Sequence, residues 1–200
     1  MSAEILVVYY SRNGTTAQLA RQVCRGVESV AGAAARLRSV PPVTAESERP
    51  VSAAPDAGAP WATLDDLAGC DGLILGSPVR FGNMAAPLKY FIDQTSGLWL
   101  RGALVDKPAA VFTSSQTLHG GQESTLLSMM TPLLHHGMLL AGLPFTLPEL
   151  PATRSGGTPY GASHVTSAST SGELSAEESQ LARALGRRVA TLALALKAAR

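Results

Sequence analysis

Three segments of the chain carry the polar and glycine residues that can hold an anion and a flat heterocycle. The first is rich in hydroxyl groups and consists of Ser11, Arg12, Asn13, Gly14, Thr15 and Thr16. A hydroxyl-rich loop that opens a helix presents backbone N–H groups to an anion, and this one is neither a P-loop nor a dinucleotide-binding glycine motif. It therefore fits a phosphate monoester that stays bound. The structural alternative is an ordinary turn in which Thr15 or Thr16 caps the helix.

The second segment places an aromatic residue where a turn usually carries polar ones. It runs from Ser77 to Met84 and contains Pro78, Val79, Arg80, Phe81, Gly82 and Asn83. An exposed Phe81 would stack on a flat partner, and Gly82 lets the backbone approach that partner closely. The alternative is that Phe81 folds back into the core.

The third segment offers hydrogen-bonding groups to the edge of a heterocycle. Its members are Ser114, Ser115, Gln116, Thr117, Leu118, His119, Gly120, Gly121 and Gln122. Hydroxyl and amide side chains both donate and accept hydrogen bonds, and the two glycines keep the backbone close. A glycine-rich connection without a ligand is the alternative.

Two further residues, His135 and Trp99, lie outside these loops. A histidine at the end of a helix often interacts only with the helix dipole, and Trp99 is either a surface packing residue or one wall of a substrate pocket. The four histidines and two cysteines match no metal-ligand spacing, so we expect no metal site. Cys24 and Cys70 form no CxxC pair and are expected to be buried, reduced thiols.

The order of the apolar segments explains why these loops should meet. Strands are predicted at residues 5–10, 34–40, 72–76, 108–113 and 138–143, and helices after Ser11 and at 63–67, 87–94, 122–136 and from a capping box at Ser175. This alternation predicts an α/β fold: a flavodoxin-like, doubly wound, five-stranded parallel sheet with helices on both faces, in a single domain of residues 1–200. Ligands of such sheets bind beyond the carboxyl ends of the strands, where the three loops lie. Residues 41–62 and 144–172 are expected to be irregular.

Composition excludes several function classes. The net charge of +1 provides no basic stripe for nucleic acid. The apolar run near the N-terminus is only six residues long, too short for a signal peptide or a membrane span, so we expect a cytoplasmic protein with no membrane insertion.

The chain resembles WrbA-type NAD(P)H:quinone oxidoreductases, historically called the Trp-repressor-binding protein family. The resemblance runs in family order from residue 5 to beyond 161. It rests on Tyr9-Tyr10-Ser11 with Gly14, Pro78 with Arg80-Phe81-Gly82-Asn83-Met84, Asp93-Gln94-Thr95, Gly97-Leu98-Trp99 with Gly102-Ala103-Leu104, Gly120-Gly121-Gln122-Glu123, His135-His136-Gly137-Met138, and Gly156-Gly157-Thr158-Pro159-Tyr160-Gly161. The first loop departs from the family, because Arg12-Asn13 stand where many members have an aromatic residue before the glycine that is thought to meet the nicotinamide cofactor.

The resemblance implies FMN as the cofactor, NADH or NADPH as the co-substrate, and a quinone as the acceptor in ping-pong hydride transfer. It implies that residues 11–16 hold the FMN phosphate, that residues 79–81 hold the isoalloxazine, and that residues 114–119 add further contacts. It also implies that His135 touches the flavin as the candidate catalytic group, that Trp99 faces the substrate, and that the protein is a homotetramer or homodimer.

Two other functions remain as alternatives. A flavodoxin-type electron carrier would usually be strongly acidic, and this chain is nearly neutral. A regulatory flavin-binding protein that acts on DNA would need a basic recognition helix, and the sequence contains none.

Overall fold

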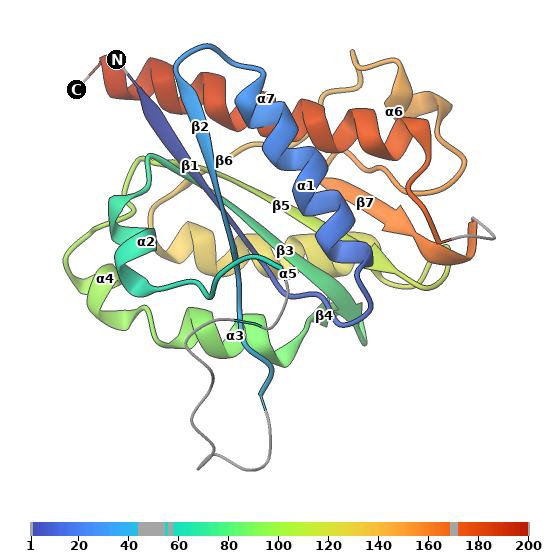
Figure 1. Ribbon diagram of the computed structural model, residues 1–200, viewed down its shortest axis with the longest axis horizontal. Coiled ribbons are helices and arrows are strands. Elements are labelled where there is room, and N and C mark those ends of the chain that lie inside the picture. The colour runs from blue at the N-terminus through green and yellow to red at the C-terminus, as the bar shows by residue number, and fades with distance from the viewer. Residues whose placement is uncertain (1, 44–54, 56–57, 169–171, 200) are drawn as a thin grey trace.

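The computed structural model describes residues 2–43, 55, 58–168 and 172–199, and they form an α/β fold around one central sheet (Figure 1). The elements in chain order are β1 (Ala3–Tyr9), α1 (Thr15–Glu28), β2 (Ala33–Ser39), α2 (Leu64–Gly69), β3 (Gly72–Arg80), β4 (Asn83–Met84), α3 (Ala86–Asp93), α4 (Ser96–Leu100), β5 (Pro108–Ser115), α5 (Gln122–His135), β6 (Leu139–Leu140), α6 (Glu149–Ala152), β7 (Ala162–Val165), a 3₁₀ turn at Thr166–Ala168, and α7 (Ala176–Ala198). The predicted alternation of strands and helices is confirmed.

The sheet is doubly wound, as predicted. Its strand order is β2-β1-β3-β5-β6, all parallel, with β7 also beside β5 and β4 antiparallel to the end of β3. The chain leaves β1 to one side for β2 and then crosses to the other side for β3. Such a reversal opens a crevice at the carboxyl ends of the strands, and ligands bind there.

Alternating residues of the strands build a separate core on each face of the sheet. In β1, Ile5 and Val7 pack on the side of α1 and α7, whereas Leu6 and Val8 pack on the side of α2, α3 and α5. All four side chains are fully buried. A strand buried on both faces reads as a continuous apolar run, which is why the sequence predicted this one correctly.

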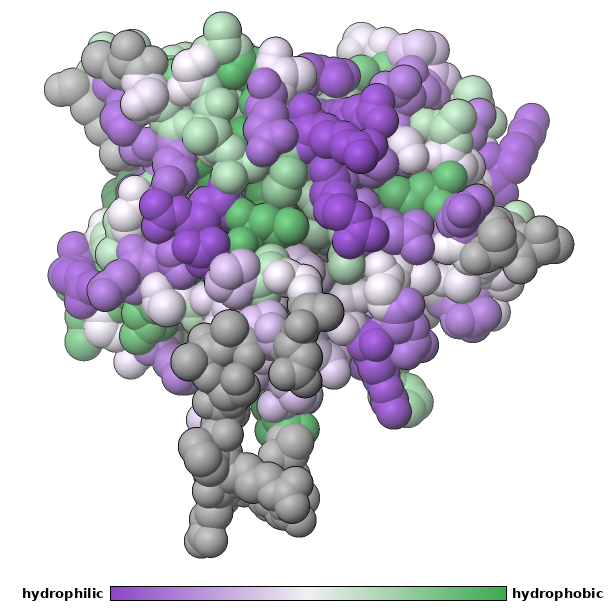
Figure 2. Space-filling model, in the orientation of Figure 1, coloured by the Kyte–Doolittle hydropathy of each residue, from purple (hydrophilic) through white to green (hydrophobic). Residues whose placement is uncertain are grey.

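Helices α1 and α7 cross in direct backbone contact. A Cβ atom added to Gly186 would lie 2.1 Å from the backbone oxygen of Val23, and one added to Gly26 would lie 2.0 Å from that of Arg183. Glycine is therefore needed at both positions. The outer face of α1 is hydrophilic (Figure 2).

Three elements at the carboxyl ends of the strands differ from the sequence prediction. Strand β3 continues past Gly76 to Arg80. Its neighbour β1 ends at Tyr9, so beyond Gly76 the side of β3 that faced β1 has no strand beside it, whereas the other side still pairs with β5. The missing N–H of Pro78 therefore costs no sheet hydrogen bond. Trp99, for which the sequence predicted no helix, lies in the short helix α4. The two-residue strand β4 turns the end of β3 into a hairpin.

The fifth strand position is shared by two short strands. Strand β6 pairs with Pro108 and Ala109, and β7 pairs with residues 112–115, so the strand predicted at 138–143 is mostly wrong. Between them the chain leaves the sheet through α6. The expectation that 144–172 is irregular is wrong at α6, at β7 and at the 3₁₀ turn that follows it, and residues 144–148 and 153–161 form no helix or strand. Residues 169–171 lie outside the described residues. The segment that returns the chain to the sheet passes so close to β5 that a Cβ on Gly161 would lie 2.2 Å from the Val111 oxygen.

Of the predicted loop 41–62, residues 44–54 and 56–57 lie outside the described residues. The described part of this loop contains only an isolated bridge from Trp61 to Ser39.

The buried carboxylate of Glu178 fastens β7 to the rest of the fold. It accepts hydrogen bonds from the N–H groups of Gly156 (2.8 Å), Val165 (3.1 Å) and Ser175 (2.9 Å), and it lies 2.7 Å from Nδ1 of His164. The predicted capping box at Ser175 is confirmed. Burial acts to raise the pKa of Glu178, but the hydrogen bonds from His164 and from the backbone outweigh it and hold the pKa below its usual value.

Glu178→Gln is expected to lower the free energy of unfolding by about 2–4 kcal/mol at pH 7, because a buried network loses its charged acceptor. A group whose pKa is lowered by folding stabilises the protein above its unfolded pKa, and this stabilisation is lost as the pH falls through the folded value. The gap between wild type and variant should therefore narrow below about pH 4.5, the usual value for Glu. Urea unfolding at pH 7 and pH 4 measures this, with Glu177→Gln as the control, because the neighbouring Glu177 is only partly buried and accepts a single side-chain hydrogen bond, from Ser175. Equal midpoints for the two variants at pH 7 would contradict the assignment.

Candidate active site

A cluster of hydroxyl groups joins the first loop to the end of β5. The Thr16 and Ser114 hydroxyl oxygens are 2.8 Å apart, and the Thr15 hydroxyl donates to the same Ser114 oxygen at 3.3 Å. Thr16 and Ser114 are both buried. Since β3 lies between β1 and β5 in the sheet, these contacts bridge the crevice over the end of β3.

The first loop has free hydrogen-bond donors for an anion. Gly14 occupies the N-cap position of α1 with φ 88° and no side-chain cap, so the predicted capping by Thr15 or Thr16 is wrong. The Ser11 hydroxyl oxygen instead accepts the N–H groups of Gly14 (3.1 Å) and Ala17 (3.3 Å). Among the described residues, the N–H groups of Thr15 and Thr16 have no partner. Two unpaired N–H groups at a helix N-terminus form an anion site.

A cavity of about 150 Å³ collects most of the residues predicted from the three loops. It is lined by Arg12, Asn13, Thr15, Thr16, Pro78, Val79, Arg80, Ser114, Ser115, Gln116 and Thr166. Among the described residues, the lining contains two arginines and no carboxylate, so it favours an anion. Only Thr166 was missed from the sequence, because it follows β7, a strand that the local pattern does not reveal.

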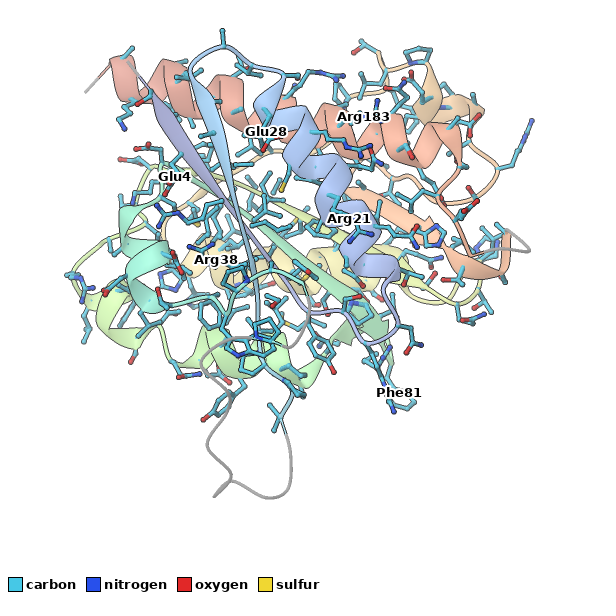
Figure 3. All side chains as sticks on the ribbon, viewed as in Figure 1. Glu4, Arg21, Glu28, Arg38, Phe81 and Arg183 are labelled. Atoms are coloured by element: carbon cyan, nitrogen blue, oxygen red, sulfur yellow. The ribbon has the colours of Figure 1, made fainter. Side chains whose placement is uncertain are left out.

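Phe81 stands at the tip of the β3–β4 hairpin and faces solvent. Its exposed fraction is 108%, and the labelled side chain projects from the body of the molecule in Figure 3. The alternative that Phe81 folds into the core is therefore wrong. Its φ of 51° is unusual for a residue other than glycine, and such strain often accompanies a functional site. Beside it, a Cβ on Gly121 would lie 2.9 Å from the Gly82 Cα, so the second and third loops touch.

The third loop is held at its base and exposed at its tip. The hydroxyl of Ser115 and the side-chain amide of Gln122 both donate to the Thr117 oxygen, at 2.9 and 2.8 Å. Residues 116–120 are exposed. The side chains of Thr117 and His119 do not line the cavity of the first loop.

Trp99 and His135 line a different and larger cavity, of about 540 Å³. This cavity lies between the hairpin, α3, α4 and one face of α5, and it begins near Asn83, two residues after Phe81. His135 sits at the far end of α5, about 10 Å along the helix from Ser128, whose hydroxyl donates to Asn83 Oδ1. Within one chain, the structure thus places Trp99 and His135 together but outside the cavity of the three loops. Trp99 is 52% exposed.

His136, which the sequence places beside His135 at the end of α5, also lines this larger cavity. Its Nε2 lies 2.8 Å from the Thr95 hydroxyl oxygen, and that hydroxyl donates to the Ile92 oxygen at 2.7 Å. The pattern assigns the proton to Nε2. Burial, and then the neighbouring His135, lower the pKa of His136, so the ring is neutral at pH 7.

Neither thiol nor metal chemistry is supported by the described residues. Burial raises the pKa of Cys24 to about 12 and that of Cys70 to about 11, so both expected thiols are protonated and inert at neutral pH. The part of the chain that the structure describes contains no group of three metal-ligating side chains. It also contains no helix with the length and apolar character needed to cross a bilayer.

Comparisons with known proteins agree with this geometry. The family model described as NADPH-dependent FMN reductase matches residues 3–147. A protein of Geotalea daltonii named NAD(P)H dehydrogenase (quinone) is 43% identical over 98% of this chain and 100% of its own length.

Solved structures are similar along the whole chain. A flavodoxin, WrbA-like protein from Agrobacterium tumefaciens has a TM-score of 0.68 and 25% identity over 97% of this chain and 99% of its own. A flavodoxin from the domain Archaea has a TM-score of 0.62 at 18% identity, over 96% of this chain and 99% of its own, and so supports the fold alone. The chain therefore belongs to the NADPH-dependent FMN reductase family and is a flavodoxin-like protein of the WrbA type.

Proposed function

We propose that this protein is an FMN-dependent NAD(P)H:quinone oxidoreductase. One observation carries the proposal: an anion cradle of unpaired N–H groups and clustered hydroxyls lies in the same crevice as a fully exposed phenylalanine. The cradle fits the phosphate of FMN, and the aromatic residue fits its flat ring. The 43% identical relative is named for the same reaction.

The dimensions of the cavity fit one end of FMN. A volume of about 150 Å³ is below the usual range for a whole ligand, so we assign the cavity to the phosphate and the ribityl chain. The isoalloxazine is assigned to the open rim, against Pro78, Val79, Arg80 and Phe81. We assign further contacts to Ser114, Ser115, Gln116, Thr117 and His119, and to Thr166, which the sequence did not indicate.

Bound FMN would supply the redox chemistry, which is hydride acceptance from NAD(P)H and reduction of a quinone to a hydroquinone by that hydride and one proton from solvent. The chain supplies binding and charge. Arg80 and the loop N–H groups are placed to stabilise negative charge on the reduced ring. Because Phe81 marks one open face, we propose that NAD(P)H and the quinone occupy that face in turn, in a ping-pong order.

Thr16→Val should weaken FMN binding about tenfold, because valine keeps the shape of threonine but cannot hydrogen-bond to Ser114 or to a phosphate. Quenching of FMN fluorescence on titration gives the dissociation constant. Thr191→Val, on the distant helix α7, is the matched control and should bind like wild type. An unchanged dissociation constant for Thr16→Val, or no quenching with wild type, argues against the assigned cradle.

We propose that a second copy of the chain completes the substrate pocket, in a homotetramer or a homodimer. Large apolar side chains are exposed on the helices around the larger cavity: Tyr90, Trp99, Leu100, Leu127 and Leu134. Exposed apolar surface of this kind suits a symmetric interface. Trp99 and His135 do not reach the three-loop cavity of their own chain, so we assign them to the flavin face of a partner copy. There His135 is the candidate hydrogen-bond or proton donor to the substrate.

Sedimentation of the FMN-loaded protein at micromolar concentration should give two or four times the chain mass of 20.7 kDa. The reason is that the exposed apolar helices are stabilised by mutual burial. A mass of one chain at that concentration would contradict the shared pocket.

Trp99→Ala should raise the KM for the quinone, because the variant loses an aromatic wall worth about 1–2 kcal/mol, or roughly five- to thirty-fold in kcat/KM. FMN affinity should change little, because Trp99 does not line the cavity of the first loop. The urea midpoint should fall by less than for a core residue, since half of the side chain is exposed within its own chain. Steady-state kinetics and denaturation of the same preparation separate the two roles. A large fall in the midpoint with a normal KM would make Trp99 a packing residue.

A further inference from the structure

A third cavity, of about 400 Å³, lies on the other side of the first loop. It is formed where β1 and β2 end and where α1 begins, and the residues that bear on its chemistry are Tyr9, Tyr10, Arg12, Arg21, Ser39 and Trp61. Its volume is within the range of small-molecule sites. It is separate from the cavities of the cradle and of the substrate pocket, although Ser11, Arg12 and Gly14 of the first loop, which were predicted to hold FMN, also line it.

The charge of this cavity favours an anion. Arg12 and Arg21 line it, and no carboxylate does among the described residues. Neither guanidinium has an ion pair or hydrogen bond in the part of the chain that the structure describes. Figure 3 shows Arg21 on the half of α1 nearer to Phe81, with Glu28 toward the other end. The positive end of the α1 dipole adds to the field of the two arginines.

The walls of the cavity favour a flat ring beside the anion. Tyr10 and Trp61 are half-buried aromatic residues in the lining. The ring of Tyr9 is buried, but its hydroxyl is near the cavity, 3.9 Å from the position that a Cβ on Gly58 would take. The Ser39 hydroxyl is already used, because it donates to the Ala59 oxygen at 2.8 Å. The two aromatic rings can stack on a flat base, the Tyr9 hydroxyl can hydrogen-bond to it, and the two arginines can bind phosphate groups. Together these groups are suited to a phosphorylated nucleoside.

The first loop separates this cavity from the proposed FMN site and is shared by both. Arg12 lines the two cavities, one on each side of the loop. A ligand with its anionic end beside Arg21 can therefore extend past Arg12 toward the crevice. A dinucleotide has this form, with phosphates between two ring systems.

We propose that this cavity binds the adenosine end of NADPH and that Arg21 determines specificity by contacting the 2′-phosphate. Arg12 contacts the pyrophosphate, and Tyr10 and Trp61 flank the adenine. The assignment rests on the proposed function, because it names where the co-substrate of that reaction is held.

Isothermal titration of the FMN-loaded protein with adenosine 2′,5′-bisphosphate and with adenosine 5′-monophosphate tests this site without turnover. Wild type should bind the bisphosphate at least about tenfold more tightly, since each arginine–phosphate contact contributes about that factor. Arg21→Gln should lose this preference. Arg25→Gln is the matched control, because Arg25 is exposed one turn further along α1 and does not line the cavity. In kinetics, the ratio of kcat/KM for NADPH to that for NADH should fall about tenfold in Arg21→Gln alone.

Equal affinity for the two nucleotides in wild type would overturn the proposal. So would a preference that survives Arg21→Gln, or one that Arg25→Gln removes equally, since the effect would then come from general surface charge. Titration with FMN in parallel separates this proposal from the function proposed above. If FMN binds and NADPH is oxidised, but the protein binds the bisphosphate no more tightly than the monophosphate, only the assignment of this cavity fails. If FMN does not bind, the proposed function fails.

Discussion

The hydrogen bond between the Thr16 and Ser114 hydroxyls is the contact on which the candidate active site depends. It fixes the start of α1 against the end of β5, across a strand that lies between β1 and β5 in the sheet. With the two ends joined, the free N–H groups of the first turn face the same crevice as Arg80. Because the bond is buried, it loses little strength to competing water. The other loops are arranged around it.

Local sequence predicted the parts of the fold that depend on local pattern. The apolar run of β1 is buried on both faces, the period of α1 matches its buried stripe, and the capping box at Ser175 forms as expected. The hydroxyl-rich loop and Ser114 were also identified, since strands of a parallel sheet end at a common edge.

The features that the sequence did not predict depend on contacts between distant segments. Strand β7 exists because Gly161 passes against Val111 and because Glu178 collects the N–H groups around it, and neither contact has a local signal. The position of Thr166 at the cavity of the first loop and the position of His135 in a different cavity also depend on contacts between segments that are distant in the sequence.

The glycine-rich stretch from Gly156 to Gly161 illustrates how a specific motif can be structural. A Cβ on Gly156 would lie 2.1 Å from the Ser163 oxygen, and the N–H of Gly156 donates to Glu178. These residues return the chain to the sheet beside β5. They lead into β7, and Thr166, which follows that strand, lies at the cavity of the first loop. The motif thus indicates the family while the loops carry the chemistry.

Two anaerobic half-reactions show whether FMN held by this protein carries electrons from NAD(P)H to a quinone. The FMN-loaded protein should lose its visible flavin absorbance on addition of one equivalent of NADPH, with no quinone present. One equivalent of benzoquinone, added afterwards, should restore the absorbance. Flavin absorbance that stays unchanged with NADPH, or that falls only when the quinone is already present, would contradict electron transfer through bound FMN.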